Sequence, residues 1–161
     1  MELKKLPSSP TCFVCGNQNS AGLQSQFYIK DEFVLLPVKF TEKHSGYPGH
    51  VHGGVVASAL DETMAWSAAR YFRRMCVTAE MTVRFLKRVP LHKELLVKTW
   101  ITKGHRLLVQ TEGVLMDIDS EEVYTRAWGK FIPISQEETE WVDKGLIYDD
   151  NTVRIFNHYR Y

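Results

Sequence analysis

The sequence lacks the long apolar runs, the strong net charge and the dense cysteine content that mark several classes of protein. No apolar stretch approaches the roughly 20 residues of a membrane-spanning helix. The opening MELKKLPSSP has two lysines but no apolar run behind them, so no secretory signal is expected. The formal net charge of +1 predicts neither a nucleic-acid nor a membrane-surface partner. Three cysteines, an odd number, do not suggest a disulfide framework, and the cytoplasm is the expected compartment.

The chain does have enough length and apolar content for one domain. Its 161 residues are 44% hydrophobic and 24% charged, as in ordinary globular domains. Three zones are expected: an irregular arm over 1–24, rich in Pro, Ser, Asn and Gly, a folded domain over 25–134, and an extension over 135–161. The pattern of the extension predicts no particular structure.

The segment Val55–Ala69 differs from the rest because it combines helix formers with abundant Ala and Ser. It contains no Lys or Arg, and its only formal charges are Asp61 and Glu62. Small side chains let other backbones approach from all sides, and the arginines within 70–74 suit a helix C-terminus. The pattern predicts a mostly buried helix over about 53–73.

Short β-type runs surround this helix. Two are expected before it, at Gln26–Ile29 and Phe33–Phe40, and Pro37 predicts that the second is bulged or at a sheet edge. Four more follow as a meander with turn signals between them: Cys76–Arg88, Glu94–Thr102, Arg106–Met116 and Glu122–Ile134. This order predicts an α+β fold in which an antiparallel sheet wraps around one long central helix.

Two features of the helix are suited to chemistry. Asp61 places a carboxylate amid apolar residues, where a bare charge is costly, although a salt bridge or a loop cap would also explain it. Gly53 and Gly54 leave the first-turn amides uncovered, and such amides together with the helix dipole stabilise an oxyanion. A plain glycine-rich turn would explain this pair as well.

Together the two features are the minimum set for hydrolysing a thioester, whose leaving group needs little acid catalysis. Gly53 and Asp61 are eight residues apart in the sequence, about 12 Å along a helix, so one carbonyl cannot contact both within a single chain. A two-fold pairing of antiparallel helices would bring Gly53 of one subunit opposite Asp61 of the other. If the pattern carries catalysis, it predicts a homodimer or a tetramer of such dimers.

The loop before the helix carries a longer motif. It reads His44-x-Gly46-x-Pro48-Gly49-x-x-His52-Gly53-Gly54, with Asp61 nine residues after His52. Together with the strand that starts at Thr78 and the arm segment Cys12-Phe13-Val14-Cys15-Gly16, this motif resembles the PaaI-like acyl-CoA thioesterases of the hotdog superfamily. The resemblance covers roughly residues 12–134.

The resemblance implies a hotdog fold that hydrolyses an acyl-CoA to the free acid and coenzyme A without a cofactor. Gly53 N–H would polarise the thioester carbonyl, and Asp61 from the other subunit would act as nucleophile or general base. His52 would orient the carbonyl, and Thr78 would help to place water or substrate. Strict alternation puts Thr78 on the more polar face of its strand, so whether it faces the helix stays open. Glu62 is a rival carboxylate, turned about 100° away on a helix.

The remaining candidates would bind the substrate. His44 and Gly54 lie in the loop and at the helix start, and the cations Lys87, Arg88 and Arg106 would hold the phosphates of coenzyme A. Most such cations are solvated surface without a ligand.

Other interpretations compete with this one. Cys12 and Cys15 have a metal-ligand spacing, and His44, His50 or His52 would complete a zinc site. No second Cys-x-x-Cys follows, so a turn packed by two small thiols is preferred and no metal is expected. A non-catalytic acyl-CoA-binding hotdog protein and, less favoured, a zinc-stabilised interaction module are the alternative functions. The sequence does not specify the acyl group.

Overall fold

The structure, a computed structural model, describes residues 3–156. Its strands form one antiparallel sheet in the order β1-β2-β3-β5-β6-β7-β4. The elements are β1 (Lys4–Lys5), β2 (Tyr28–Lys30), β3 (Phe33–Val38), the 3-10 helix η1 (Glu42–His44), α1 (Gly53–Phe72), β4 (Cys76–Phe85), β5 (Leu95–Gly104), β6 (Val109–Asp117), β7 (Val123–Pro133) and α2 (Gln136–Lys144).

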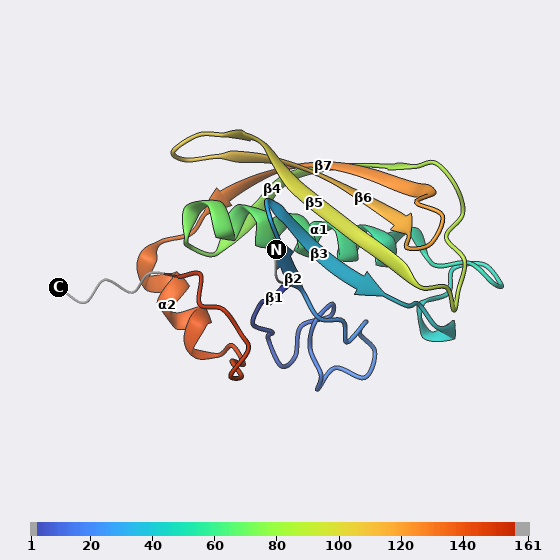
Figure 1. The fold of residues 1–161 in the computed structure, drawn as a ribbon, viewed down its shortest axis with the longest axis horizontal. Coiled ribbons are helices and arrows are strands. Elements are labelled where there is room, and N and C mark those ends of the chain that lie inside the picture. Colours follow the sequence, from blue (N-terminus) through green and yellow to red (C-terminus); the bar gives the residue numbers. More distant parts are fainter. Residues whose placement is uncertain (1–2, 157–161) are drawn as a thin grey trace.

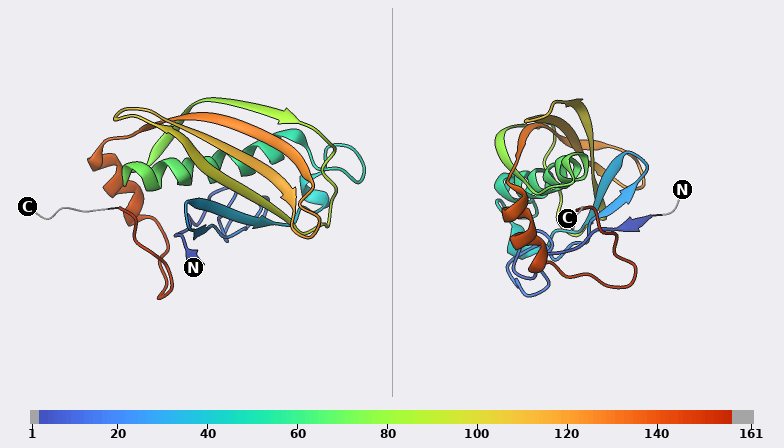
Figure 2. Two further views of the ribbon diagram at one scale, coloured as in Figure 1. Left: turned by 45° about the horizontal axis from the view of Figure 1, so that its top comes forward. Right: turned by 90° about the vertical axis from the view of Figure 1, so that its left-hand side faces the viewer.

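Helix α1 lies in the curve of the sheet and packs against β3 to β7 (Figures 1 and 2). Its central side chains, among them Leu60, Met64 and Ala68, are fully buried. The helix ends at Arg73, which adopts the left-handed conformation common at helix C-termini. The predicted hotdog architecture, a sheet wrapped around one long helix, is therefore confirmed. No helix within residues 3–156 has the length and apolarity needed to cross a membrane.

The six predicted strands are all present, with ends shifted by a few residues, whereas β1 and α2 were not predicted. Pro37 lies in β3 opposite Leu96 of β5, beyond the stretch of β3 that β2 covers. The prediction of a bulged or edge strand is wrong for β3 as a whole, which lies between β2 and β5 without a bulge in its pairing to β5. At Pro37, however, β3 is paired on the β5 side alone within residues 3–156, and a residue without an N–H is tolerated where one side of a strand is open.

The strict alternation expected for β4 is wrong at its start, because a β-bulge lies between Thr78 and Glu80. Before the bulge Thr78 pairs with the buried Phe131, and after it Met81 pairs with Gly129. The extra residue lets both Thr78 and Met81 face α1, although they are three positions apart. Val77, which strict alternation would put on the same face as Met81, is instead 53% exposed.

The arm and the extension cover the side of α1 that faces away from the central strands (Figure 2). Leu6 and Val14 of the arm and Phe156 of the extension join the same buried core as the helix. Trp66 of α1 lies between two rings, with centroid distances of 6.0 Å to Phe27 and 6.2 Å to Phe156. Both terminal segments therefore contribute to the core around α1.

Candidate active site

The first turn of α1 presents a free backbone amide. His52 is the N-cap, and its Nδ1 accepts the N–H of Gly54 at 2.9 Å. A neutral ring that accepts at Nδ1 carries its proton on Nε2, which makes that atom a donor. Within residues 3–156, the N–H of Gly53 has no acceptor. The helix start thus offers Gly53 N–H, reinforced by the helix dipole, to a ligand oxygen.

A pocket of about 620 Å³ opens at this helix start. Its lining includes His52, Gly53 and Phe85, together with the cations Lys87 and Arg88. A Cβ at Gly53 would lie 3.3 Å from the Phe85 ring, so glycine lets the ring lie directly over the helix start. The pocket combines an amide donor, an apolar wall and two cations, which suits an acyl thioester with phosphate groups.

Asp61 lies half-buried two turns further along α1, and its Oδ1 accepts a 2.7 Å hydrogen bond from the Thr78 hydroxyl. No arginine pairs with this carboxylate within residues 3–156. The bulge in β4 turns Thr78 toward the helix, which the sequence left open. A salt bridge, which would have been a purely structural reason for a carboxylate at this position, is therefore not formed within residues 3–156.

Asp61 does not line the pocket at Gly53. Gly53 and Asp61 also contact opposite ends of β4. Gly53 packs against Phe85 at the end of the strand, whereas Asp61 accepts a hydrogen bond from Thr78 near its start. A single chain therefore keeps the amide donor and the carboxylate apart, as the spacing along the helix predicted.

The other predicted residues fall into two groups. Lys87, which pairs with Glu122, and Arg88 line the pocket. His44 is buried away from it; its Nδ1 accepts Thr41 N–H at 3.0 Å and its Nε2 lies 3.3 Å from the Gly22 carbonyl. Gly54 gives its N–H to His52, and Arg106, in the turn after β5, does not line the pocket. His44, Gly54 and Arg106 thus have no direct place in this pocket.

The structure also brings together Glu62, Cys12 and Cys15, which the sequence analysis considered separately and did not predict to be in contact. Glu62 lies 2.8 Å from the sulfur of Cys12 and 3.4 Å from that of Cys15. Burial, and next the nearby Cys12, raises the pKa of Glu62 to about 8. The pKa of Cys12 is lowered to about 5, mainly because its sulfur accepts a hydrogen bond from the Cys15 thiol. The same hydrogen bond raises the pKa of Cys15. One indication of this cluster was present in the sequence, since Glu62 is one of only two charged residues in the segment Val55–Ala69 and therefore needs a polar partner.

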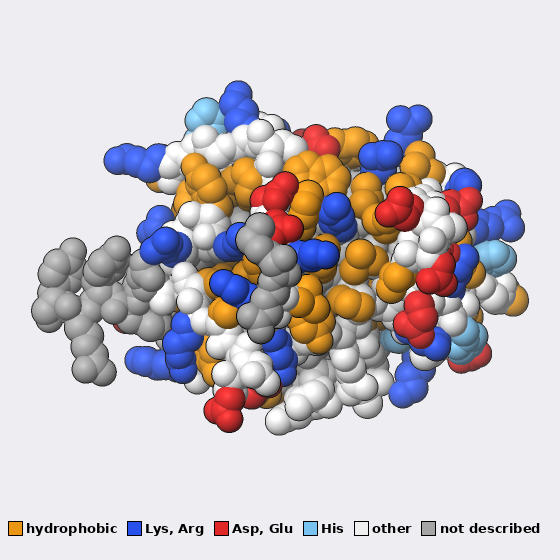
Figure 3. Space-filling model, in the orientation of Figure 1, with side chains coloured by type: hydrophobic (Ala, Val, Ile, Leu, Met, Phe, Trp, Pro, Cys, Tyr) orange, Lys and Arg blue, Asp and Glu red, His pale blue; other side chains and the backbone are white. Residues whose placement is uncertain are grey.

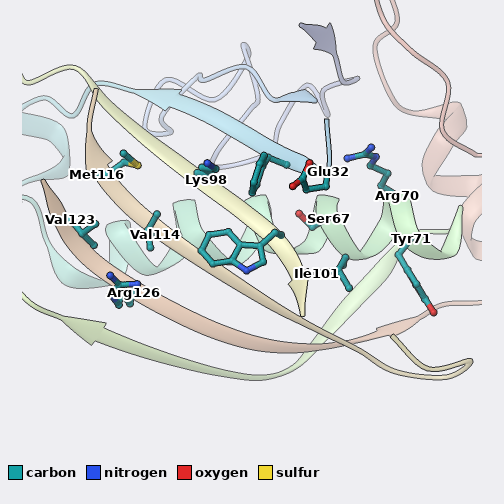
Figure 4. Close-up of a pocket in the computed structure, with 12 residues that line it drawn as sticks. Glu32, Ser67, Arg70, Tyr71, Lys98, Ile101, Val114, Met116, Val123 and Arg126 are labelled. Atoms are coloured by element: carbon teal, nitrogen blue, oxygen red, sulfur yellow. The ribbon is translucent and has the colours of Figure 1, made fainter. Parts of the chain in front are cut away.

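A larger pocket of about 800 Å³ lies elsewhere, beside the central strands (Figure 4). Arg70, Lys98 and Arg126 border it, well separated from one another, and Trp100 also lines it. Figure 3 shows apolar side chains on the viewed face, with charges of both signs scattered among them. None of the predicted catalytic residues lines this larger pocket, so the smaller one at Gly53 is the candidate active site.

Comparison with known proteins agrees with this geometry. The family model of the thioesterase superfamily matches residues 48–124, a segment that contains His52-Gly53-Gly54, Asp61 and Thr78. This stretch of the chain is thus similar to the thioesterase superfamily, and it lies within the hotdog fold described above. The resemblance predicted from the motif is confirmed at this level.

Particular relatives are known. Acyl-coenzyme A thioesterase THEM4 of Mus musculus is 30% identical over 95 residues, which are 58% of this chain and 40% of the relative. THEM4 of Rattus norvegicus is 27% identical over 117 residues, 71% of this chain and 49% of the relative. The chain therefore spans less than half the length of these curated relatives.

Solved structures show the same fold. The crystal structure of a thioesterase superfamily protein aligns with a TM-score of 0.69 and 26% identity, covering 76% of this chain and 60% of that one. The PaaI protein of the E. coli phenylacetic acid degradation operon aligns with a TM-score of 0.64 and 15% identity, covering 70% and 81%. At that identity the PaaI match supports the fold alone.

Proposed function

We propose that this protein hydrolyses an acyl-CoA thioester to the free acid and coenzyme A. The observation that carries the proposal is the N–H of Gly53, which has no acceptor among residues 3–156 and lies at a pocket lined by Lys87 and Arg88. The same helix carries Asp61, which is hydrogen-bonded to Thr78. The relatives named as acyl-CoA thioesterases support the substrate class. A cytoplasmic location and the lack of a cofactor stay predictions from the sequence.

In the proposed mechanism, the thioester carbonyl oxygen accepts Gly53 N–H and, beside it, the Nε2–H of His52. As the carbonyl becomes tetrahedral, these donors stabilise the negative charge on its oxygen. Asp61 either removes a proton from the attacking water or attacks the carbonyl carbon itself to form an anhydride that water then cleaves. In the general-base route, water forms the new C–O bond, the C–S bond breaks, and Asp61 passes the water proton to the coenzyme A thiolate. In the nucleophilic route, the Asp61 oxygen bonds to the acyl carbon as the C–S bond breaks. Water then forms a C–O bond to the acyl carbon, the anhydride C–O bond breaks to restore Asp61, and one proton of that water goes to the thiolate.

The proposal requires two copies of the chain, and β4 is the surface that supports pairing. It is a ten-residue edge strand, bordered by β7 on one side alone. Val77 near its start is 53% exposed, and Phe85 and Leu86 at its end are 52% and 44% exposed. A long open edge strand with exposed apolar side chains favours pairing with another strand. We infer a two-fold axis near Met81 and Thr82 of two antiparallel β4 strands.

Such pairing would set Thr78 of one copy opposite Phe85 of the other. Because Asp61 bonds to Thr78 and Gly53 lies under Phe85, the carboxylate of each subunit would then approach the amide donor of its neighbour. Each dimer would hold two such shared sites, and a tetramer would hold four.

The test is a hydrolysis screen over short, medium, long and aromatic acyl-CoAs, read by release of the coenzyme A thiol, with light scattering to give the number of subunits. We expect turnover of at least one class by a dimer or tetramer. Isothermal titration with the same acyl-CoAs covers the rival function: tight binding without turnover of any of them would show a non-catalytic acyl-CoA-binding protein and overturn the proposal.

A further inference from the structure

Three metal-ligating side chains from distant parts of the chain converge beside α1. The sulfurs of Cys12 and Cys15 and a carboxylate oxygen of Glu62 all lie within 4.8 Å of one another. The thiols come from the arm and the carboxylate from the middle of the helix, about 50 residues later in the sequence. The spacing Cys-x-x-Cys alone offered two ligands, and the fold adds a third.

The backbone of the arm is arranged to stabilise thiolates. Cys12 Sγ accepts the N–H groups of Val14 at 3.2 Å and of Cys15 at 3.3 Å. Cys15 Sγ accepts the N–H of Ser9 at 3.4 Å. A Cβ at Gly16 would lie 2.5 Å from the Cys12 carbonyl oxygen, so the tight turn that aims these amides requires glycine. The thiolate is the form that binds metals, and amide donors favour it.

The cluster brings together three groups that are anionic when deprotonated. Cys15 is buried, and Cys12 and Glu62 are half-buried. Within residues 3–156, no lysine or arginine forms an ion pair with Glu62. Both sulfurs lie within hydrogen-bond distance of the Glu62 carboxyl group, so these groups share protons when no metal is bound. A divalent cation would replace these protons and satisfy all three groups at once.

We propose that Cys12, Cys15 and Glu62 bind a Zn²⁺ ion. Two thiolates and one carboxylate form a mixed sulfur and oxygen set that suits zinc, whereas Mg²⁺ and Ca²⁺ require oxygen ligands throughout. Tetrahedral zinc would take water as its fourth ligand, since the described chain places no other His, Cys, Asp or Glu in the cluster. The three histidines considered from the sequence lie outside the cluster. His44 is held by Thr41 and Gly22, His50 Nδ1 lies 3.0 Å from the Pro48 carbonyl, and His52 Nδ1 accepts Gly54 N–H.

This third ligand revises the interpretation of the Cys-x-x-Cys turn as mere packing. The ion would fasten the arm to α1 at the residue directly after Asp61. Because Glu62 is turned about 100° from Asp61 around the helix, the metal would face the arm and not the candidate active site. The expected role is to stabilise the arm on the helix.

The experiment is a titration of the reduced, full-length protein with Co²⁺ and then Zn²⁺. We expect one Co²⁺ per chain, a near-ultraviolet thiolate-to-cobalt charge-transfer band, and loss of that band when Zn²⁺ displaces the cobalt. Elemental analysis after dialysis against zinc should give about one zinc per chain, as expected for a set of three protein ligands. A wild-type protein that shows no charge-transfer band, or whose Cys12 and Cys15 form a disulfide in place of binding metal, would overturn the proposal.

Variants locate the site. The Cys12→Ser/Cys15→Ser protein should lose the band and the zinc, and Glu62→Gln, which keeps both thiols and the side-chain size, should weaken zinc binding by about tenfold or more. Cys76→Ser is the matched control, because Cys76 is the other free cysteine and lies on β4 outside the cluster. Loss of zinc in Cys76→Ser, or retention of zinc in folded Cys12→Ser/Cys15→Ser, would contradict the assignment. Unchanged affinity in Glu62→Gln would contradict the role of the carboxylate.

Discussion

The hydroxyl of Thr78 donates a 2.7 Å hydrogen bond to Oδ1 of Asp61, and so joins the edge strand β4 to the middle of α1. The contact exists because the bulge after Thr78 turns this side chain toward the helix. It holds the carboxylate in one orientation and leaves its second oxygen for water or substrate. A group that acts as a base or nucleophile benefits from this preorganisation.

Thr78→Ala should lower kcat by about tenfold, which corresponds to about 1.4 kcal/mol. A hydrogen bond to a charged group contributes about 1.5–3 kcal/mol when buried, and exposure of this site to solvent reduces the value. Thr78→Ser keeps the hydroxyl and should stay close to wild type. Thr102→Ala is the matched control, because Thr102 is an exposed threonine of β5, which pairs with β3 and β6, and its hydroxyl donates to the Gln110 carbonyl, away from the pocket at Gly53. Equal kcat values for Thr78→Ala and Thr102→Ala would show that the contact has no part in catalysis.

Asp61→Asn should lower the rate of thiol release by about a hundredfold or more, since asparagine neither removes a proton nor attacks a carbonyl. The substitution keeps the size of the side chain and its ability to accept from Thr78. Circular dichroism and light scattering should therefore match wild type. Undiminished turnover by this folded variant would rule out Asp61 as the catalytic group.

The sequence predicts the helix, the strands and the architecture because each depends on local patterns. The apolar segment rich in Ala and Ser has helical length, and the runs after it alternate with period two. The bulge at Ala79 was not predictable in this way, because it depends on the register between β4 and β7. The same limit applies to Glu62, whose thiol partners lie about 50 residues away in the sequence and are brought to it by the packing of the arm on α1.

Helix α2 was not predicted, although the sequence contains a pattern typical of a helix start. Ser135 and Glu138 form a capping box: the Ser135 hydroxyl accepts Glu138 N–H, and the Glu138 carboxylate accepts Ser135 N–H. Thr139 of this helix accepts the N–H of Met75 at 3.1 Å, which ties the extension to the turn after α1. The strand β1 has no comparable signal, since two residues carry no periodic pattern.

Stability should depend on pH through Asp117, at the end of β6. An ion pair with Lys93 and the N–H groups of Ser120 and Asp119 lower the pKa of this carboxyl to about 2, from 3.8. A depressed pKa means that the contribution to stability is fully present above about pH 4 and is lost as the pH falls toward 2. Asp117→Asn should lower the urea midpoint at pH 7, and the difference from wild type should narrow at pH 2 to 3. A difference that does not change with pH would contradict the ion-pair explanation.

The central claim, a site shared between two subunits, calls for two complementary variants. Asp61→Ala removes the carboxylate. Gly53→Pro removes the amide donor at the first helical position, where proline is tolerated by the backbone, and it requires the Phe85 ring to move by a few tenths of an ångström. His52 before it already has φ −63° and ψ 132°, the extended conformation that a following proline requires. Each variant alone should be folded, dimeric and inactive, as judged by circular dichroism, gel filtration and thiol release.

The most direct measurement is the activity of an equal mixture of these two variants after they are unfolded and refolded together. Random pairing makes about half of the dimers mixed, and in each mixed dimer one site inherits both lesions while the other combines an intact Gly53 with an intact Asp61. The shared-site account predicts recovery to about a quarter of wild-type activity. If each site lay within one chain, every site would carry a lesion. A refolded mixture as inactive as its two components would contradict the account.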